Sequence, residues 1–265
     1  MTEPPQEWIE VQDALKRRLI LEDDFAFVID PNQPNSSNRE RLRYVGGVDL
    51  SFLKEDPCVA CGALVVIDLE NNLLVVYEDF AVVRLDVPYI PGFLAFREAP
   101  VLLELLEKMK RQAHPFYPQL LMVDGNGLLH PRGFGLACHL GVLADLPTIG
   151  VGKNLHHVDG LTQSGMRQLL EASENCAKDL FFLTGNSGCT WGVALRSTPG
   201  SSKPIFISTG NRISLESSIK VVKMCCKYRV PESIRQADIS SRAYLKNLEG
   251  SLMQHASNEP DNETI

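Results

Sequence analysis

Four acidic residues are the side chains of this 265-residue sequence with the clearest potential for chemistry: Asp49, Glu98, Asp124 and Asp238. Asp49 lies inside an apolar segment at 44–52, and Asp124 ends another at 120–124. A carboxylate that is buried without a partner costs several kcal/mol of folding free energy or takes up a proton. Asp49 therefore requires an arginine, hydrogen-bond donors or a cation beside it.

Each acid also has an ordinary structural interpretation when it is taken alone. Asp124 precedes a Gly-Asn-Gly turn, where a turn or helix-cap aspartate is common. Glu98 falls in the first turn of an expected helix, where the helix dipole favours negative charge. Asp238 fits an exposed helical acid between two arginines. This interpretation is weakest for Asp49, because its neighbours in the segment are apolar.

Considered together, the four acids indicate a site for divalent cations, because the elements that carry them can converge in an α/β fold. Carboxylate oxygens favour hard cations such as Mg²⁺ or Mn²⁺. Two such ions about 4 Å apart can activate water and stabilise a leaving oxygen in phosphodiester hydrolysis. The formal net charge is −7, so bound cations rather than the overall charge of the protein would meet a phosphate.

The elements that must position these acids follow an α/β pattern. Apolar spacing predicts strands at 43–53, 58–69, 72–83, 119–124, 147–151, 180–184, 190–196 and 204–209. It predicts helices at 7–21, 97–112, 136–145, 163–176, 214–227 and 232–247. The first three strands, joined by short loops, imply an antiparallel meander, and the later alternation implies parallel strands flanked by helices. Hydrophobic residues make up 44% of the chain, which fits a single domain over 1–250 and a disordered tail at 251–265.

Seven cysteines are an odd number in a chain of this length, which favours free thiols. Cys58 and Cys61 form a CxxC pair, but a zinc site needs a second pair at similar spacing, and Cys225 and Cys226 are adjacent. A thioredoxin-like pair would open a helix, whereas this pair leads into an expected strand. Small residues on a strand are therefore the favoured interpretation, and a thiol-based redox or zinc protein is kept as an alternative.

The start of the sequence contains neither a basic cluster nor an apolar run, and no stretch approaches the roughly 18 apolar residues of a membrane helix. We therefore expect an intracellular monomer without membrane contact, in the cytoplasm and in the nucleus or nucleolus.

Four longer motifs closely resemble the endonuclease V family, in the order and spacing of that family, and they span most of residues 44–242. They are YVGGVDLSF at 44–52, PYIPGFLAFRE at 88–98, VDGNGLLHPR at 123–132 and IGVGK at 149–153. The resemblance implies a ribonuclease H-like mixed sheet. It also implies cleavage of nucleic acid strands at the second phosphodiester bond 3′ to inosine or deoxyinosine, with Mg²⁺ or Mn²⁺ as cofactor.

The resemblance assigns roles to the acids and to one lysine. Asp49, Glu98 and Asp124 match the catalytic metal-binding acids of the family. Asp238 matches a fourth metal-binding position, which is Asp in some members and His in others. Lys153 matches a lysine near the reacting phosphate.

Further residues match the substrate-binding positions of the family: Tyr89, Ile90, Pro91, Gly92, Leu94, Gly125 and His130. The Pro-Tyr-Ile-Pro element matches a wedge that separates bases, and two prolines would hold Tyr89 and Ile90 on a stiff tip. Glycine at 92 and 125 would let backbone approach a flipped base closely. His130 could support the metal acids, contact phosphate or serve only the structure. Asn211 replaces a histidine expected at its position, which puts a phosphate contact there in doubt.

The choice between RNA and DNA depends on contacts to a 2′-OH that the sequence does not locate. The CxxC strand and the cysteine-bearing helix bring the chain nearer to vertebrate members, which prefer inosine-containing single-stranded RNA. We therefore expect inosine-containing RNA as the main partner and deoxyinosine-containing DNA as a weaker one. Local basic residues could either track the backbone or form a solvated face: Lys220, Lys223, Lys227, Arg229, Arg235 and Arg242. A module that reads inosine without cutting is the other alternative.

Overall fold

The computed structural model describes residues 3–30, 39–172, 179–198, 201 and 203–257. Its strands are β1 (Tyr44–Phe52), β2 (Val59–Asp68), β3 (Leu74–Arg84), β4 (Leu120–Asp124), β5 (Thr148–Gly152), β6 (Leu180–Thr184), β7 (Thr190–Leu195) and β8 (Ile205–Asn211). Its helices are α1 (Gln6–Lys16), α2 (Ala95–Arg111), α3 (Leu136–Ala144), α4 (Gln163–Ala172), α5 (Leu215–Met224) and α6 (Glu232–Ser257).

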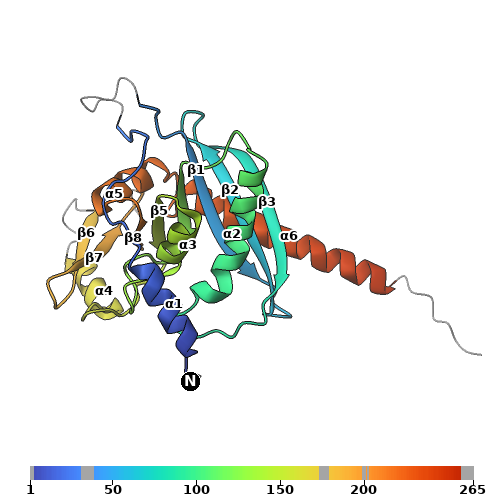
Figure 1. The fold of residues 1–265 in the computed structure, drawn as a ribbon, viewed down its shortest axis with the longest axis horizontal. Helices are drawn as coiled ribbons and strands as arrows, with labels where there is room; N and C mark the ends of the chain where they lie inside the picture. Colours follow the sequence, from blue (N-terminus) through green and yellow to red (C-terminus); the bar gives the residue numbers. More distant parts are fainter. Residues whose placement is uncertain (1–2, 31–38, 173–178, 199–200, 202, 258–265) are drawn as a thin grey trace, which may run out of the picture.

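The strands form one eight-stranded mixed sheet in the order β3-β2-β1-β4-β5-β8-β7-β6 (Figure 1). Strands β1, β2 and β3 form an antiparallel meander, whereas β4 runs parallel to β1 and β5 runs parallel to β4. The predicted α/β class is confirmed, as is the ribonuclease H-like mixed sheet with an antiparallel meander followed by parallel strands. Asn72 and Leu73 both have positive φ, as a tight turn between β2 and β3 requires.

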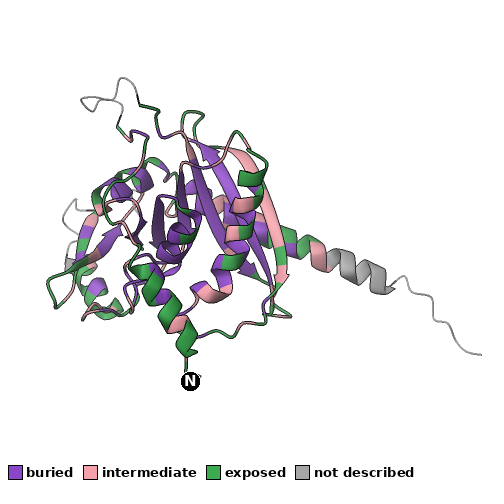
Figure 2. Ribbon diagram, viewed as in Figure 1, coloured by how far each residue is buried: buried purple, intermediate pink, exposed green. Residues whose placement is uncertain are grey.

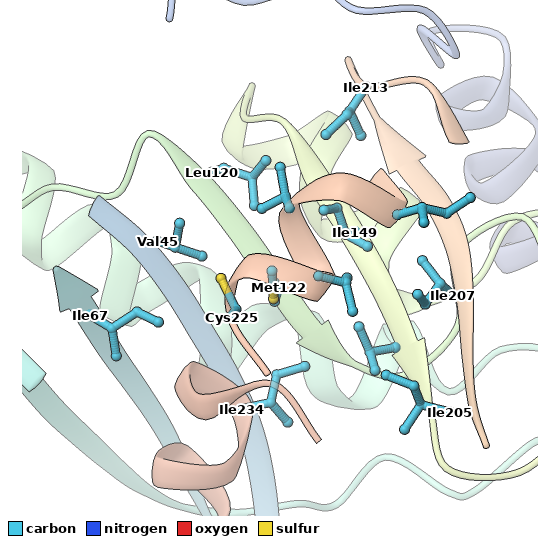
Figure 3. Close-up of a cluster of buried hydrophobic side chains, with 14 of the residues drawn as sticks. Val45, Ile67, Leu120, Met122, Ile149, Ile205, Ile207, Ile213, Cys225 and Ile234 are labelled. Atoms are coloured by element: carbon cyan, nitrogen blue, oxygen red, sulfur yellow. The ribbon is translucent and has the colours of Figure 1, made fainter. Parts of the chain in front are cut away.

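Helices cover both faces of the sheet, so its central strands are buried on both sides. Figure 2 shows β1 and β2 almost entirely buried, and the buried apolar run of β4 has the same character. One face packs against α2 and α3. The other packs against α5 and α6, where Ile234 and Cys225 belong to the same buried cluster as Val45, Met122 and Ile207 (Figure 3).

Helix α6 approaches β1 so closely that only glycine fits at position 47. A Cβ atom at Gly47 would lie 2.2 Å from the carbonyl carbon of Ser233, near the start of α6. A buried hydrogen bond of 2.7 Å between the hydroxyl groups of Ser51 and Ser241 joins the same two elements further along. These contacts fix the side chains of α6 relative to the end of β1.

Three helix ends differ from the prediction. Helix α1 ends at Lys16 rather than at 21, and α5 ends at Met224 rather than at 227. The predicted end of the fourth helix, at 173–176, lies outside the described residues. Helix α6 continues to Ser257, beyond the predicted end at 247 and through the first part of the expected tail at 251–265. The rest of that expectation, at 258–265, lies outside the described residues. Among the helices that the structure describes, none has both the length and the apolar character needed to cross a bilayer.

Candidate active site

Asp49 and Asp124 meet because β1 and β4 are parallel neighbours. The register pairs Val48 with Val123, and each acid is the next residue of its strand. Asp124 is the neighbouring acid that acts most strongly on the pKa of Asp49. Burial, together with the charge of Asp124, raises the pKa of Asp49 to about 8. The fold therefore places two carboxyl groups side by side where solvent has little access to Asp49.

Lys153 brings a positive charge to this pair. It follows β5 directly, and β5 runs beside β4 with Val151 opposite Asp124. Its Nζ lies 2.5 Å from Oδ2 of Asp124, and the ammonium partly offsets the raised pKa of Asp49. Burial lowers the pKa of Lys153 itself, but the hydrogen bond to Asp124 and the nearby acids outweigh that effect and raise it.

Glu98 reaches the same region from the first turn of α2. Its side chain is buried, and burial raises its pKa to about 7, with Arg97 opposing the shift and the charge of Asp124 adding to it. Asp124 therefore acts electrostatically on both buried acids, Asp49 and Glu98. The position of Glu98 at the start of a helix would by itself favour a structural role. Here, however, Glu98 is also buried near Asp124.

Asp238 approaches Asp49 from α6. Its charge contributes to the raised pKa of Asp49. Its side chain is about a quarter exposed, and one carboxylate oxygen lies 2.7 Å from Nη2 of Arg242. Asp238 thus forms the helical ion pair that its ordinary interpretation predicts. It also lies close enough to Asp49 to affect the pKa of that residue.

A cleft of about 740 Å³ contains most of these groups. Its lining includes Asp49, Asp124, Lys153 and Asp238, whereas Glu98 is not among the residues that line it. A neighbouring cavity of about 940 Å³ shares Lys153 with the cleft but contains none of the four acids. Lys153 thus marks the boundary between the acidic cleft and the larger cavity.

The donor set fits a hard divalent cation, although the four acids do not form one tight group. Within the described residues, no three Asp, Glu, His or Cys side chains come together closely enough to hold a metal ion. Asp49 and Asp124 lie on adjacent parallel strands, each directly after a paired valine. Their oxygen chemistry suits Mg²⁺, and a cation beside them would favour the ionised form that burial disfavours. Joint metal binding by all four acids stays a prediction.

The CxxC pair Cys58 and Cys61 gains no functional support from its position in the fold. Cys58 is exposed at the start of β2, whereas Cys61 is fully buried, and burial raises the pKa of its thiol to about 11. A thiol with a raised pKa is a poor nucleophile and a poor metal ligand at neutral pH.

The predicted wedge is exposed only in part. Tyr89 is 65% exposed, but Ile90 is 4% exposed and belongs to the core. The expectation that both side chains project from a stiff tip is therefore wrong for Ile90, because this side chain turns inward and anchors the loop. Pro91 is exposed, and Gly92 has a φ of +84°, which favours glycine. Leu94 is half-buried at the start of α2.

The glycine turn after β4 brings His130 back toward the protein interior. Gly125 has a φ of +154°, and its N–H donates to the carbonyl of Val151. His130 is buried, and its Nδ1 accepts a hydrogen bond from the backbone N–H of Arg132. Burial lowers the pKa of His130 to about 4, so the ring is neutral at pH 7. These contacts favour the structural role among the three that the sequence left open.

Asn211 has a structural role in place of the expected histidine. Its side chain is buried, and its Nδ2 donates to the carbonyl of Gly141 at 3.1 Å. Its Oδ1 accepts from the backbone N–H of Ile20 at 3.2 Å. The side chain thus faces the interior, where it joins β8 to α3 and to the segment after α1.

Gln12 is a residue near the site that the sequence interpretation missed. It is 1% exposed and donates hydrogen bonds to the carbonyl groups of Gly92 and Phe134. A signal was present, because Trp8, Gln12 and Leu15 fall at helical spacing on one face. A polar residue on an apolar helix face needs a buried partner.

Comparisons with known proteins agree with the geometry. The family model described as Endonuclease V matches residues 30–239. Endonuclease V of Mus musculus is 46% identical over 253 residues, covering 94% of this chain and 73% of the mouse protein. Endonuclease V of Homo sapiens is 45% identical over 247 residues, covering 92% of this chain and 85% of the human protein.

Solved structures are similar along nearly the whole chain. The crystal structure of the human protein has a TM-score of 0.82 at 44% identity, and the match covers 92% of this chain and 98% of the human one. Ciona intestinalis endonuclease V, in complex with a 24mer DNA containing an inosine followed by a ribo-adenosine, has a TM-score of 0.81 at 32% identity. That match covers 91% of this chain and 98% of the Ciona chain. The sequence, the fold and the cleft thus place this chain in the endonuclease V family, whose members are hydrolases of phosphodiester bonds.

Proposed function

We propose that this protein is a divalent-metal-dependent endonuclease that cuts nucleic acid at the second phosphodiester bond 3′ to inosine. The observation that supports the proposal most directly is the buried Asp49 beside the half-buried Asp124, with the ammonium of Lys153 next to them. The same three groups line one cleft, which in this proposal receives the nucleic acid strand. We expect a monomer that acts in the cytoplasm and nucleolus.

In this proposal, Asp49, Glu98, Asp124 and Asp238 hold Mg²⁺, for which Mn²⁺ can substitute. When bound, such an ion supplies an activated water and stabilises charge on the departing oxygen. Lys153 orients the scissile phosphate or donates a proton to the leaving oxygen, and its raised pKa keeps it charged for this task. Asp124 positions Lys153 through their 2.5 Å ion pair.

Base recognition is assigned to the two loops beside the cleft. Tyr89 is free to stack against a neighbouring base, because most of its ring is exposed. Gly92, Leu94 and Gly125 would form a pocket with a backbone N–H toward O6 and a carbonyl toward N1–H of hypoxanthine. Adenine presents the opposite donor and acceptor there and would leave both groups unpaired. Guanine shares the edge of hypoxanthine but adds an amino group that a tight pocket excludes.

Single-stranded RNA is the preferred substrate in this proposal, and deoxyinosine-containing DNA is the weaker one. One finding supports a place for ribonucleotides: the 24mer DNA in the Ciona complex carries a ribo-adenosine directly after inosine. The nucleotide directly 3′ to inosine comes just before the second phosphodiester bond, so its 2′-OH is next to the expected cleavage position.

The test uses purified protein with Mg²⁺ and matched RNA and DNA oligonucleotides that carry one inosine or, as control, one adenosine. We expect a single cut at the second bond 3′ to inosine, faster in RNA, and no cut beside adenosine. Asp49→Asn should abolish cleavage and retain much of the binding. Tight inosine binding without cleavage by the wild type would favour the reader module instead. Cleavage by Asp49→Asn at the wild-type rate would contradict the assignment of the site.

A further inference from the structure

Helix α1 joins the two loops that carry the predicted base pocket, although it precedes residues 30–239 that the family model matches. One loop, at 85–94, connects β3 to α2 and includes Tyr89 and Gly92. The other, at 125–135, connects β4 to α3. Figure 1 shows α1 lying beside α3, on the side of the molecule where α2 begins.

Gln12 makes the connection through both ends of its side-chain amide. Its Nε2 donates to the carbonyl of Gly92 at 3.0 Å and to the carbonyl of Phe134 at 3.3 Å. Its Oε1 accepts a short hydrogen bond from Nε of Arg132. One fully buried amide thus bridges a residue of the first loop and two residues of the second.

Arg132 is held in place for this contact by α1 and by the first loop. Its Nη2 lies 3.0 Å from Oδ1 of Asp13, and its carbonyl accepts from Nζ of Lys16 at 2.7 Å. Its guanidinium lies 5.1 Å from the centre of the Phe93 ring, next to Gly92. These contacts fix the hydrogen-bonding edge of Arg132 toward Gln12 and restrain the second loop against the first.

We propose that Gln12 is a positioning residue that holds the backbone of Gly92 against the second loop and thereby sets the discrimination between inosine and guanosine. This inference rests on the proposed function, because it concerns the pocket assigned there. A pocket that excludes an extra amino group by its tightness needs a fixed separation between its two loops, and the bridging amide supplies it. Gly92 depends on this restraint, since its φ of +84° is a conformation that glycine leaves easily.

The docking of α1 does not depend on Gln12 alone. Trp8 stacks on Phe96 of α2 with ring centroids 4.8 Å apart, and Leu15 is buried against Phe134 and Cys138. A variant that loses the amide contacts should therefore keep α1 in place. Gln6 offers a matched control on the same helix, because it is exposed and, among the described residues, its side chain hydrogen-bonds to Glu10 of the same helix at 3.1 Å.

Two substitutions separate the contacts of Gln12. Gln12→Met keeps the size of the side chain and removes both its donor and its acceptor. Gln12→Glu keeps an acceptor for Arg132 but cannot donate to Gly92. The control is Gln6→Met. For each, kcat and KM are measured on oligonucleotides with inosine, and the ratio of kcat/KM for inosine over guanosine is compared with that of the wild type. Thermal unfolding checks that each variant is folded.

We expect both Gln12 variants to raise KM for the inosine strand about tenfold, as the loss of one positioning hydrogen bond implies, and to lower the inosine-over-guanosine ratio. The value of kcat at saturating substrate should stay near that of the wild type, because the acids are untouched. Gln6→Met should match the wild type throughout. An unchanged KM and ratio in folded Gln12→Met would overturn the inference, as would a loss of kcat alone. Failure of the wild type to cut beside inosine would instead refute the proposed function.

Discussion

Nζ of Lys153 lies 2.5 Å from Oδ2 of Asp124, so the site carries its own positive charge beside its pair of aspartates. This ammonium opposes the rise in the pKa of Asp49 that burial and Asp124 produce. The same lysine lines both the acidic cleft and the larger cavity next to it. Lys153 is therefore placed to contact a nucleic acid strand that runs from the acidic cleft into the larger cavity.

Replacement of Lys153 by methionine should impair catalysis more than binding. The change removes the charge next to Asp124 and keeps most of the apolar length of the side chain. We expect kcat to fall about 10²–10³-fold, the range found when a charge-stabilising donor is removed from an active site. Lys153→Arg should recover part of the rate. The measurement is single-turnover cleavage of an inosine-containing strand, and a rate within a factor of a few of the wild type would exclude a catalytic role.

The stability of the metal-free protein should fall as the pH rises toward 8. Burial raises the pKa of Asp49 to about 8 and that of Glu98 to about 7. The folded protein thus holds protons that the unfolded chain has already released. The stability from these groups is complete below about pH 4 and is lost as the pH rises through 7 and 8.

Thermal unfolding in EDTA tests this dependence. We expect the melting temperature of Asp49→Asn, relative to that of the wild type, to increase as the pH rises from about 5 to about 9, because Asn carries no buried charge. Asp56→Asn is the control. Its ion pair with Arg84 lowers the pKa of Asp56, so this acid is ionised over the whole range in both states. A constant difference between Asp49→Asn and the wild type would contradict the raised pKa of Asp49.

The neighbouring residues Tyr89 and Ile90 should give opposite results on substitution. Tyr89→Ala removes an exposed ring and should leave the melting temperature unchanged, while KM rises by the equivalent of about 1–3 kcal/mol of lost base stacking. Ile90→Ala empties a buried position and should lower the free energy of unfolding by about 2–4 kcal/mol. Cleavage kinetics give KM for both variants, and denaturant unfolding gives their free energies of unfolding. Equal effects of the two on KM would restore Ile90 as a second wedge residue.

Gly47→Ala should disturb the site through the backbone of α6. The new Cβ would lie 2.2 Å from the carbonyl carbon of Ser233, so α6 must move away from β1 and carry Asp238 with it. We expect a loss of about 1–3 kcal/mol in the free energy of unfolding, together with lower activity in the protein that remains folded. Gly165→Ala, at an exposed helical position, is the control and should not reduce activity. Full activity of Gly47→Ala would show that the position of α6 is not critical.

The strands and helices of this fold could be predicted because their apolar spacing is local. The apolar pattern predicts a buried strand at 119–124 that ends in an acid, and β4 spans Leu120–Asp124. The convergence of Asp49 and Asp124 could also be expected, because adjacent parallel strands end at the same edge of a sheet. Each acid follows a residue that is paired between β1 and β4. The family resemblance added Lys153, and the structure places it beside Asp124.

The features that sequence could not provide depend on contacts between distant segments. Gln12 meets Gly92 across 80 positions, and no local pattern reveals which backbone carbonyl it binds. The burial of Ile90, which is 4% exposed beside the exposed Tyr89, also appears only in the folded chain. Asn211 could be recognised as a departure from the family, but its interior bonds to α3 appear only in the folded chain.

The most direct test of the account is the binding of Mn²⁺ to the wild type and to Asp49→Asn, measured by electron paramagnetic resonance at about pH 8, where the acids of the site lose their protons. The account predicts saturable Mn²⁺ binding to the wild type, displaced by Mg²⁺, unchanged in the thiol variant Cys58→Ser and at least about tenfold weaker in Asp49→Asn. Equal affinity of the wild type and Asp49→Asn for Mn²⁺, or loss of binding in Cys58→Ser, would contradict it.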